Sequence, residues 1–152
     1  MSIAARLAEL GVELPEPAKP VASYVSFVQT SNLLHISGQL SNDASGGIKG
    51  TVGVDVTPDQ AQAAARLCAI NLIAQMKSAL DGDLDRVVRV VKRGGFVQAG
   101  PGFTAIPAVI NGCSDLMVEV FGDAGKHARS AVGVYQLPLG FAVEVDAIVE
   151  VR

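Results

Sequence analysis

Hydrophobic and polar positions alternate most regularly near the C-terminal end of the chain, between residues 143 and 151. One side of this alternation consists of Val143, Val145, Ala147, Val149 and Val151, and the other of Glu144, Asp146, Ile148 and Glu150. A period of two predicts a β-strand with one face against a hydrophobic core. Residues 131–135 form a shorter apolar run, and Pro138 and Gly140 punctuate the segment between the two runs. We therefore expect two antiparallel strands joined by a short loop.

Two stretches have the three-and-four spacing of helices that bury one face. The first begins at Thr57-Pro58-Asp59-Gln60, which combines a hydroxyl N-cap, a proline in the first turn and a glutamine three residues after the cap. Its apolar stripe consists of Ala61, Ala64, Ala65, Cys68, Leu72, Met76, Ala79 and Leu80, and Gly82 can end it. The second helix is expected to run from Ile106, with Pro107 in its first turn, to the glycines of residues 122–125.

Three further strands and one short helix complete the prediction. Residues 22–29, 33–38 and 86–98 are rich in apolar residues, and Gly94-Gly95 marks a possible bulge or turn in the last of them. Residues 3–10 have the spacing of a short helix, followed by a proline-rich connector up to residue 21. Since both long helices have a single apolar stripe, we expect them to cover one face of a single mixed sheet, an α+β fold in which residues 1–152 form one domain.

Composition limits what this domain can bind. The 152 residues carry a formal charge of −3 without a basic block, so nucleic-acid binding is not indicated. No segment resembles a signal peptide or a membrane span, and Cys68 and Cys113 lie on the helical stripes as expected for buried free thiols, so we expect a soluble cytoplasmic protein. A mean hydropathy of +0.37 and the apolar Ile148 on the outward side of the last strand favour an oligomer that covers the open face of the sheet.

Candidate chemical groups are few. His35 and His127 are far apart in sequence and both cysteines are isolated, so no metal site is predicted. His35 and Ser37 share a strand face, but a nucleophilic serine also needs a third group that orients the histidine, and no G-x-S-x-G motif is present. The glycine-rich segments 94–95 and 100–102 lack the residues that accompany a phosphate-binding loop.

Arg129 is the most informative side chain, because the expected hairpin would place it near the carboxylates of the last strand. An arginine fork suits a substrate carboxylate, and a neighbouring glutamate suits the handling of a proton or a water molecule. The alternative interpretation is a surface arginine paired with a surface glutamate. The periodicity alone favours this alternative, since exposed ion pairs are common.

Four segments form a pattern that extends beyond any one of them: Ile36-Ser37-Gly38-Gln39, Ala128-Arg129-Ser130-Ala131-Val132, Leu137-Pro138 and Val143-Glu144-Val145-Asp146-Ala147. Tyr24 stands thirteen positions before Ser37. In this register the chain resembles the RidA/YjgF/UK114 family, and in particular its longer, chorismate-mutase-like branch, in which an active-site tyrosine has the same spacing from a serine. The resemblance runs from about Val21 to the C-terminus.

The resemblance implies a homotrimer with a barrel-like centre, helices outside and three clefts between neighbouring subunits. It also implies a hydrolase that needs no cofactor and deaminates small enamine or imine intermediates bearing a carboxylate, with a 2-oxo acid and ammonia as products. By the same resemblance, Arg129 would hold the substrate carboxylate and Glu144 would position or activate the attacking water. Tyr24, Ser37 and Gly38 would line the pocket.

Three departures from the family pattern fall near this pocket, and one of them is that Gly122 to His127 differs from the family. Deaminating members often have a cysteine two residues after the arginine, where this chain has Ala131. They also have an asparagine in the preceding helix that aligns with residues 111–115 only through a gap. The alternative function is therefore a non-catalytic, regulatory trimer that binds a 2-oxo acid or a similar small metabolite in the same cleft.

Overall fold

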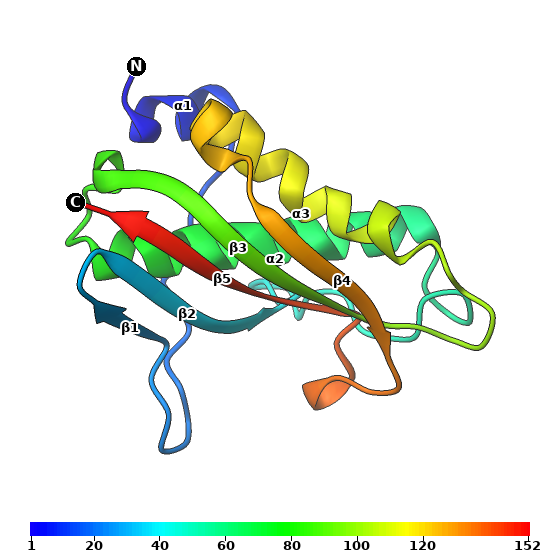
Figure 1. The fold of residues 1–152 in the computed structure, drawn as a ribbon. Helices are drawn as coiled ribbons and strands as arrows, with labels where there is room; N and C mark the ends of the chain where they lie inside the picture. Colours follow the sequence, from blue (N-terminus) through cyan, green and yellow to red (C-terminus); the bar gives the residue numbers. More distant parts are fainter.

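The computed structural model describes residues 1–152 and contains one five-stranded sheet with helices on one side (Figure 1). The strands are β1 (Phe27–Thr30), β2 (Leu33–Leu40), β3 (Val87–Gln98), β4 (Ala128–Val134) and β5 (Val143–Val151). The α-helices are α1 (Ile3–Glu9), α2 (Pro58–Ala79) and α3 (Ile106–Phe121). Short 3-10 helices are η1 (Leu84–Arg86), η2 (Gly122–Gly125) and η3 (Pro138–Gly140). No helix combines the length and the apolar character needed to span a membrane.

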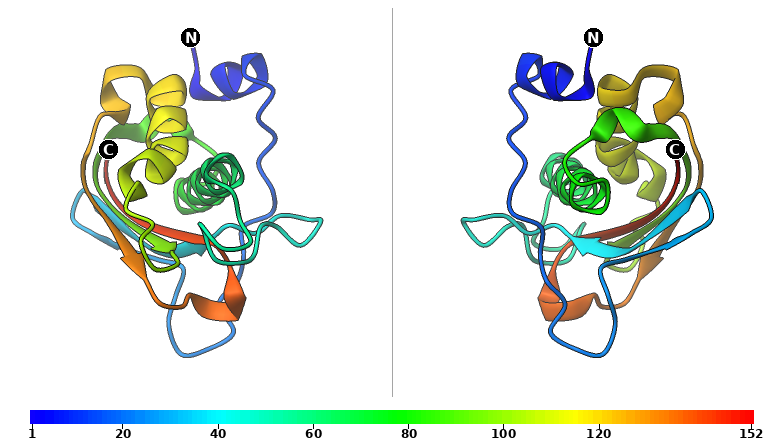
Figure 2. Two further views of the ribbon diagram at one scale, coloured as in Figure 1. Left: turned by 90° about the vertical axis from the view of Figure 1, so that its right-hand side faces the viewer. Right: turned by 90° about the vertical axis from the view of Figure 1, so that its left-hand side faces the viewer.

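Helices α2 and α3 lie against the same face of the sheet, which curves around them (Figure 2). The start of α2 has the expected capping box, in which Thr57 and Gln60 bond reciprocally to each other's backbone N–H groups. The two helices approach closely at Gly112 of α3, where a Cβ atom would overlap the backbone of Gln62 on α2. The expected α+β arrangement, a single mixed sheet with two helices on one face, is confirmed.

The alternation along β5 is also confirmed. Its apolar side is fully buried in the core, whereas Glu144, Asp146, Ile148 and Glu150 are half-buried on the opposite side. Helix α2 packs against β5 and β2, and α3 packs against β3 and β4. The other face of the sheet has no layer of its own chain over it, and we call it the open face (Figure 2).

The predicted hairpin of the last two strands is wrong. Strand order in the sheet is β1-β2-β5-β3-β4, so β3 separates β4 from β5. Strand β4 is parallel to β3, with Arg129 opposite Arg93, and all other pairs are antiparallel. The reason is the crossover: α3 carries the chain from the end of β3 back to the start of β4, which produces a parallel neighbour. The segment around η3, which connects β4 to β5, therefore passes across the end of β3 and does not form a tight turn.

Strand boundaries and bulges differ from the prediction in β1, β2 and β3. Strand β1 begins only at Phe27, whereas β2 continues to Leu40. Gly94 and Gly95 pair regularly, and the register shifts of β3 lie earlier, between Val87 and Lys92. A third irregularity lies in β2, where Ser37 and Gly38 fall between paired residues. Gly95 is needed for packing, because a Cβ atom there would lie 2.7 Å from the side chain of Ile110.

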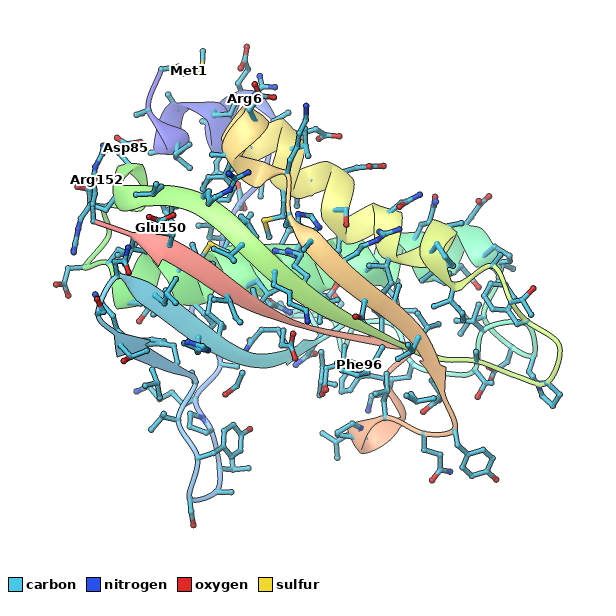
Figure 3. The ribbon with its side chains drawn as sticks, viewed as in Figure 1. Met1, Arg6, Asp85, Phe96, Glu150 and Arg152 are labelled. Carbon is cyan, nitrogen blue, oxygen red and sulfur yellow. The ribbon has the colours of Figure 1, made fainter.

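The short N-terminal helix is confirmed and is attached to the end of the sheet where the C-terminus lies (Figure 3). The backbone N–H of Ile3 donates to the carboxylate of Asp85 at 2.8 Å, and Arg6 donates to the carbonyl of Glu119 on α3 at 2.8 Å. Arg152 also donates to the carbonyl of Asp85. Helix α1 therefore packs at the end of α3.

Candidate functional site

Arg129 lies on the edge strand β4 and its side chain faces α3. Its Nη1 group donates to the hydroxyl of Ser114 at 3.1 Å, and its Nη2 group donates to the carbonyl of Pro107 at 3.3 Å. The only two ion pairs in the chain, Arg6–Glu9 and Lys126–Asp123, do not involve it. The guanidinium is therefore held by neutral acceptors, and its positive charge is not neutralised by a carboxylate.

Ser114 and His127 continue this hydrogen-bond chain. The Nε2 atom of His127 lies 2.9 Å from the hydroxyl of Ser114, and its Nδ1 atom lies 2.6 Å from the carbonyl of Gly125. Burial lowers the pKa of His127, as do the charges of Arg93 and Arg129, although the bond to Gly125 opposes them. The imidazole is thus expected to be neutral at pH 7. Neither residue was expected at the site, because only the packing of α3 against the start of β4 brings them together.

A second arginine lies beside Arg129 in the sheet. Arg93 is its partner in the pairing of β3 and β4, and the side chain of Arg93 is fully buried beneath α3. Its Nη1 group contacts the sulfur of Cys113, whereas Nε and Nη2 have no hydrogen-bond partner. Burial lowers the pKa of Arg93 from its ordinary value, but guanidinium groups remain charged in proteins. Two guanidinium groups therefore lie on neighbouring strands on the side of the sheet that faces α3.

Glu144 lies on the open face, next to Ser37 and Gly38. A Cβ atom at Gly38 would lie 2.8 Å from the carboxylate carbon of Glu144, so the absence of a side chain at Gly38 makes room for this carboxyl group. Burial raises the pKa of Glu144, and the negative charge of Asp146 raises it further. A carboxyl group with a raised pKa can exchange protons closer to neutral pH.

The segment that contains Tyr24 is tied to this region by Ser37. The hydroxyl of Ser37 donates to the carbonyl of Val25 at 2.7 Å, and its N–H donates to the carbonyl of Ser26 at 2.9 Å. The side chain of Tyr24 itself is 57% exposed. Gly38 and Glu144 are thus close neighbours in space, and Ser37 is bonded to the backbone that follows Tyr24.

Arg129 and Glu144 do not meet within one chain. Arg129 pairs through Arg93 with Ala147, three residues from Glu144 on β5. Two strand spacings and three residues of strand give about 14 Å between their Cα atoms, and the side chains lie on opposite faces of the sheet. The expectation that a hairpin brings Arg129 close to the carboxylates of the last strand is therefore wrong.

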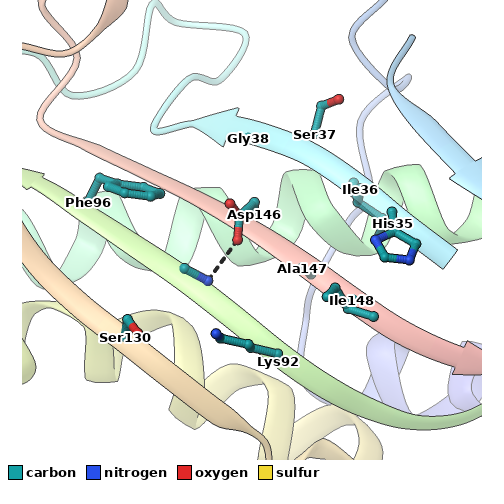
Figure 4. A pocket seen from close by; sticks show the side chains of 11 residues that line it. His35, Ile36, Ser37, Gly38, Lys92, Phe96, Ser130, Asp146, Ala147 and Ile148 are labelled. Atoms are coloured by element: carbon teal, nitrogen blue, oxygen red, sulfur yellow. Dashed lines mark hydrogen bonds between the residues drawn. The ribbon is translucent and has the colours of Figure 1, made fainter. Parts of the chain in front are cut away.

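A hollow of about 470 Å³ lies on the open face, and Figure 4 shows it with the helices behind the sheet. Its polar lining includes His35, Lys92, Ser130 and Asp146. The carboxylate of Asp146 accepts a hydrogen bond from the N–H of Gly94 at 2.7 Å. The hollow is thus a polar depression that a second molecule could cover.

The fold and the site define a class: small α+β proteins with one sheet face uncovered and an uncompensated arginine at the sheet edge. The chain matches the family described as "YjgF/chorismate_mutase-like, putative endoribonuclease" over residues 4–150. The chain therefore belongs to the YjgF/RidA family.

Individual relatives agree with this assignment. Protein TCP17 of Trypanosoma cruzi is 53% identical over 152 residues, which cover 99% of this chain and 94% of that protein. The crystal structure of a protein of unknown function from Agrobacterium tumefaciens has a TM-score of 0.93 and 48% identity, covering 99% of this chain and 92% of the other. The 2-iminobutanoate/2-iminopropanoate deaminase of Dermatophagoides farinae is 28% identical over 142 residues, covering 93% of this chain and 95% of that protein.

Proposed function

We propose that the protein hydrolyses small 2-imino acids, and the enamines in equilibrium with them, to 2-oxo acids and ammonia without a cofactor. The observation that carries the proposal is the guanidinium of Arg129, which only neutral oxygen atoms hold. An arginine whose charge is not paired with a carboxylate of the protein can bind a planar anion, because two of its N–H groups match the two oxygens of a carboxylate. The similarity to a protein named 2-iminobutanoate/2-iminopropanoate deaminase supports this choice of substrate.

The proposal includes a homotrimer in which Arg129 of one subunit faces Glu144 of a neighbour. Two features support this assembly. Arg129 and Glu144 lie on opposite faces of one sheet, so both can contact a single small substrate only if two chains contribute. The open face also exposes apolar side chains, including Val28 and Val132, which a neighbouring subunit would cover.

In the proposed reaction, Arg129 binds the substrate carboxylate and Glu144 positions a water molecule at the imine carbon. Glu144 accepts a proton from this water as its oxygen bonds to the carbon, and the same proton passes to the imine nitrogen, which gives a neutral carbinolamine. As the C–N bond breaks, Glu144 transfers the hydroxyl proton to the nitrogen, so that ammonia leaves, the 2-oxo acid forms and Glu144 is again a carboxylate. Atoms balance as one water consumed and one ammonia released. Placement of the reactants supplies most of the acceleration, since an imine carbon needs only a correctly oriented water.

A second candidate is a non-catalytic trimer that binds a 2-oxo acid and regulates a partner. One observation favours it: the hydrogen bonds that hold Arg129 are complete within one chain, whereas Glu144 is remote. Anion binding therefore needs less of the assembly than catalysis does. Ribonuclease chemistry is not proposed, because the chain has a net charge of −3 and no basic block.

The test is to generate 2-iminobutanoate with threonine dehydratase and to follow its decay with and without the purified protein. Wild type should accelerate the decay, and Arg129→Ala and Glu144→Gln should both abolish the acceleration. If 2-oxobutanoate binds saturably and the binding requires Arg129, but the decay of the imine is not accelerated, the protein is a binding protein and not a deaminase. If the wild type neither binds 2-oxobutanoate nor accelerates the decay of the imine, both candidate functions are refuted.

A further inference from the structure

We infer that Ser114 and His127 are positioning residues for Arg129 and determine which of its N–H groups face the ligand. This inference rests on the proposed function in one respect only, that the ligand of Arg129 is a carboxylate. The underlying observation is a chain of three hydrogen bonds. It runs from the carbonyl of Gly125 through His127 and the Ser114 hydroxyl to the Nη1 group of Arg129, at 2.6, 2.9 and 3.1 Å.

The carbonyl of Gly125 fixes the direction of every bond in this chain. A carbonyl only accepts, so the Nδ1 atom of His127 must carry the proton, and Nε2 of the neutral ring is an acceptor. The hydroxyl of Ser114 must then donate its only proton to Nε2. Both of its lone pairs are left for donors, and the guanidinium of Arg129 occupies one of them. The hydroxyl of Ser114 can therefore only accept a hydrogen bond from Arg129.

The positive charge of Arg93 explains why the guanidinium of Arg129 needs this hydrogen bond to stay in place. Arg93 and Arg129 are paired on neighbouring strands, both point toward α3, and no carboxylate forms an ion pair with either. Like charges at directly opposite positions repel each other, and the repulsion grows where water is excluded. Without the hydroxyl of Ser114 and the carbonyl of Pro107, the guanidinium of Arg129 would move outward into solvent.

The bonds to Ser114 and Pro107 also determine which N–H groups of Arg129 remain for the ligand. Of the five N–H donors of Arg129, one on Nη1 and one on Nη2 are used by Ser114 and Pro107. Three donors remain, namely the Nε proton and one on each terminal nitrogen. Two of these in one plane are what a carboxylate needs for bidentate binding. A mobile guanidinium would have to be ordered at the moment of binding, which weakens affinity.

The charges of Arg93 on β3 and Arg129 on β4 both disfavour the protonated form of His127, and Lys126, its neighbour in the chain, is paired with Asp123. The remaining contacts, from α3 and η2, are the hydroxyl of Ser114 and the carbonyl of Gly125. No carboxylate forms an ion pair with the imidazole. Neutral His127 is therefore consistent with the direction of the chain.

The first test is a comparison of Ser114→Ala with Ser114→Thr, which retains the hydroxyl. Titration with 2-oxobutanoate should show an affinity about tenfold weaker for Ser114→Ala, as expected from the loss of one hydrogen bond to a charged group. Ser114→Thr should retain most of the affinity. In the deaminase assay, the loss should appear in KM more than in kcat, because the chemistry at the imine carbon does not involve Ser114. Equal affinities for wild type and Ser114→Ala would overturn the inference.

The second test needs no ligand and separates this inference from the proposed function. Nitrogen-15 NMR of the wild type should show His127 with its proton on Nδ1. In Ser114→Ala, relaxation of the Nε signal of Arg129 should show that the guanidinium has become more mobile. If these signals behave as expected while no 2-oxo acid binds, the positioning role stands and the proposed ligand is wrong. A proton on Nε2 of His127, or an Arg129 signal that does not change in Ser114→Ala, would refute the positioning role itself.

Discussion

Replacement of Arg93 by methionine is expected to stabilise the fold. The side chain of Arg93 has no exposed surface, and its Nε and Nη2 groups have no hydrogen-bond partner. Its one polar contact is the sulfur of Cys113, a weak acceptor. Since a guanidinium remains charged even when it is buried, the native fold bears the cost of a poorly compensated charge.

The magnitude follows from these contacts. Each buried donor without a partner costs about 1–3 kcal/mol, so Nε and Nη2 together cost about 2–6 kcal/mol. Removal of the contact with Cys113 forfeits about 1 kcal/mol, and the volume that methionine does not fill costs about another 1 kcal/mol. A net stabilisation of about 2 kcal/mol remains, which corresponds to an increase in Tm of about 4–8 °C for a domain of this size.

The assay is thermal unfolding of wild type and Arg93→Met at one protein concentration, because oligomerisation makes Tm depend on concentration. Lys77→Met is a suitable control, since Lys77 is an exposed residue of α2 without an ion pair, and it should change stability by less than about 0.5 kcal/mol. A lower Tm for Arg93→Met than for wild type would show that the buried guanidinium is well compensated. It would refute the reasoning about unneutralised charge on which the site depends.

Three further substitutions test other parts of the account. Arg129→Lys keeps the charge but loses the planar fork, so its affinity for 2-oxobutanoate by calorimetry should fall about tenfold or more, and an unchanged affinity would argue against bidentate binding. Because the folded-state pKa of Glu144 is raised, its contribution to stability is present at low pH and is lost as pH rises through that pKa. At pH 8, Glu144→Gln should therefore unfold at a higher temperature than wild type. Near pH 4, which is about the pKa of a free carboxyl group, the two proteins should unfold at similar temperatures. A lower Tm of Glu144→Gln at pH 8 would mean that the fold stabilises the carboxylate. Gly112→Ala introduces a Cβ atom that overlaps the backbone of Gln62, so urea unfolding should show a destabilisation of about 1–3 kcal/mol, and a neutral effect would show that α2 and α3 can separate without cost.

The elements were predictable where local chemistry determines them. The capping box at Thr57 defines the start of α2, and the alternation from Val143 to Val151 defines β5 and its buried side. Both signals depend on neighbours in the sequence. Strand pairing does not: whether β4 lies beside β5 or beside β3 depends on the path of α3, and a loop containing Pro138 and Gly140 is compatible with either.

The site shows the same limit. Arg129 was singled out from an expected hairpin that does not form, whereas Ser37 and Glu144 were identified through the resemblance to the family, because their sequence segments are specific. Ser114 and His127 were missed, since nothing in the linear spacing indicates that α3 places one beside the other. Arg93 was missed because it follows Lys92 and precedes two glycines, and two consecutive charged residues in a strand favour an exposed position.

The central claim is that one cleft combines Arg129 of one chain with Glu144 of another, and mixing of two inactive variants tests it most directly. Arg129→Ala and Glu144→Gln chains would be unfolded and refolded together, and imine decay would be measured against wild type refolded in the same way. Random assortment in a cyclic trimer leaves about a quarter of all clefts with both residues intact, so the mixture should regain about a quarter of the wild-type rate. A mixture as inactive as its two parents, despite formation of mixed trimers, would contradict the shared cleft.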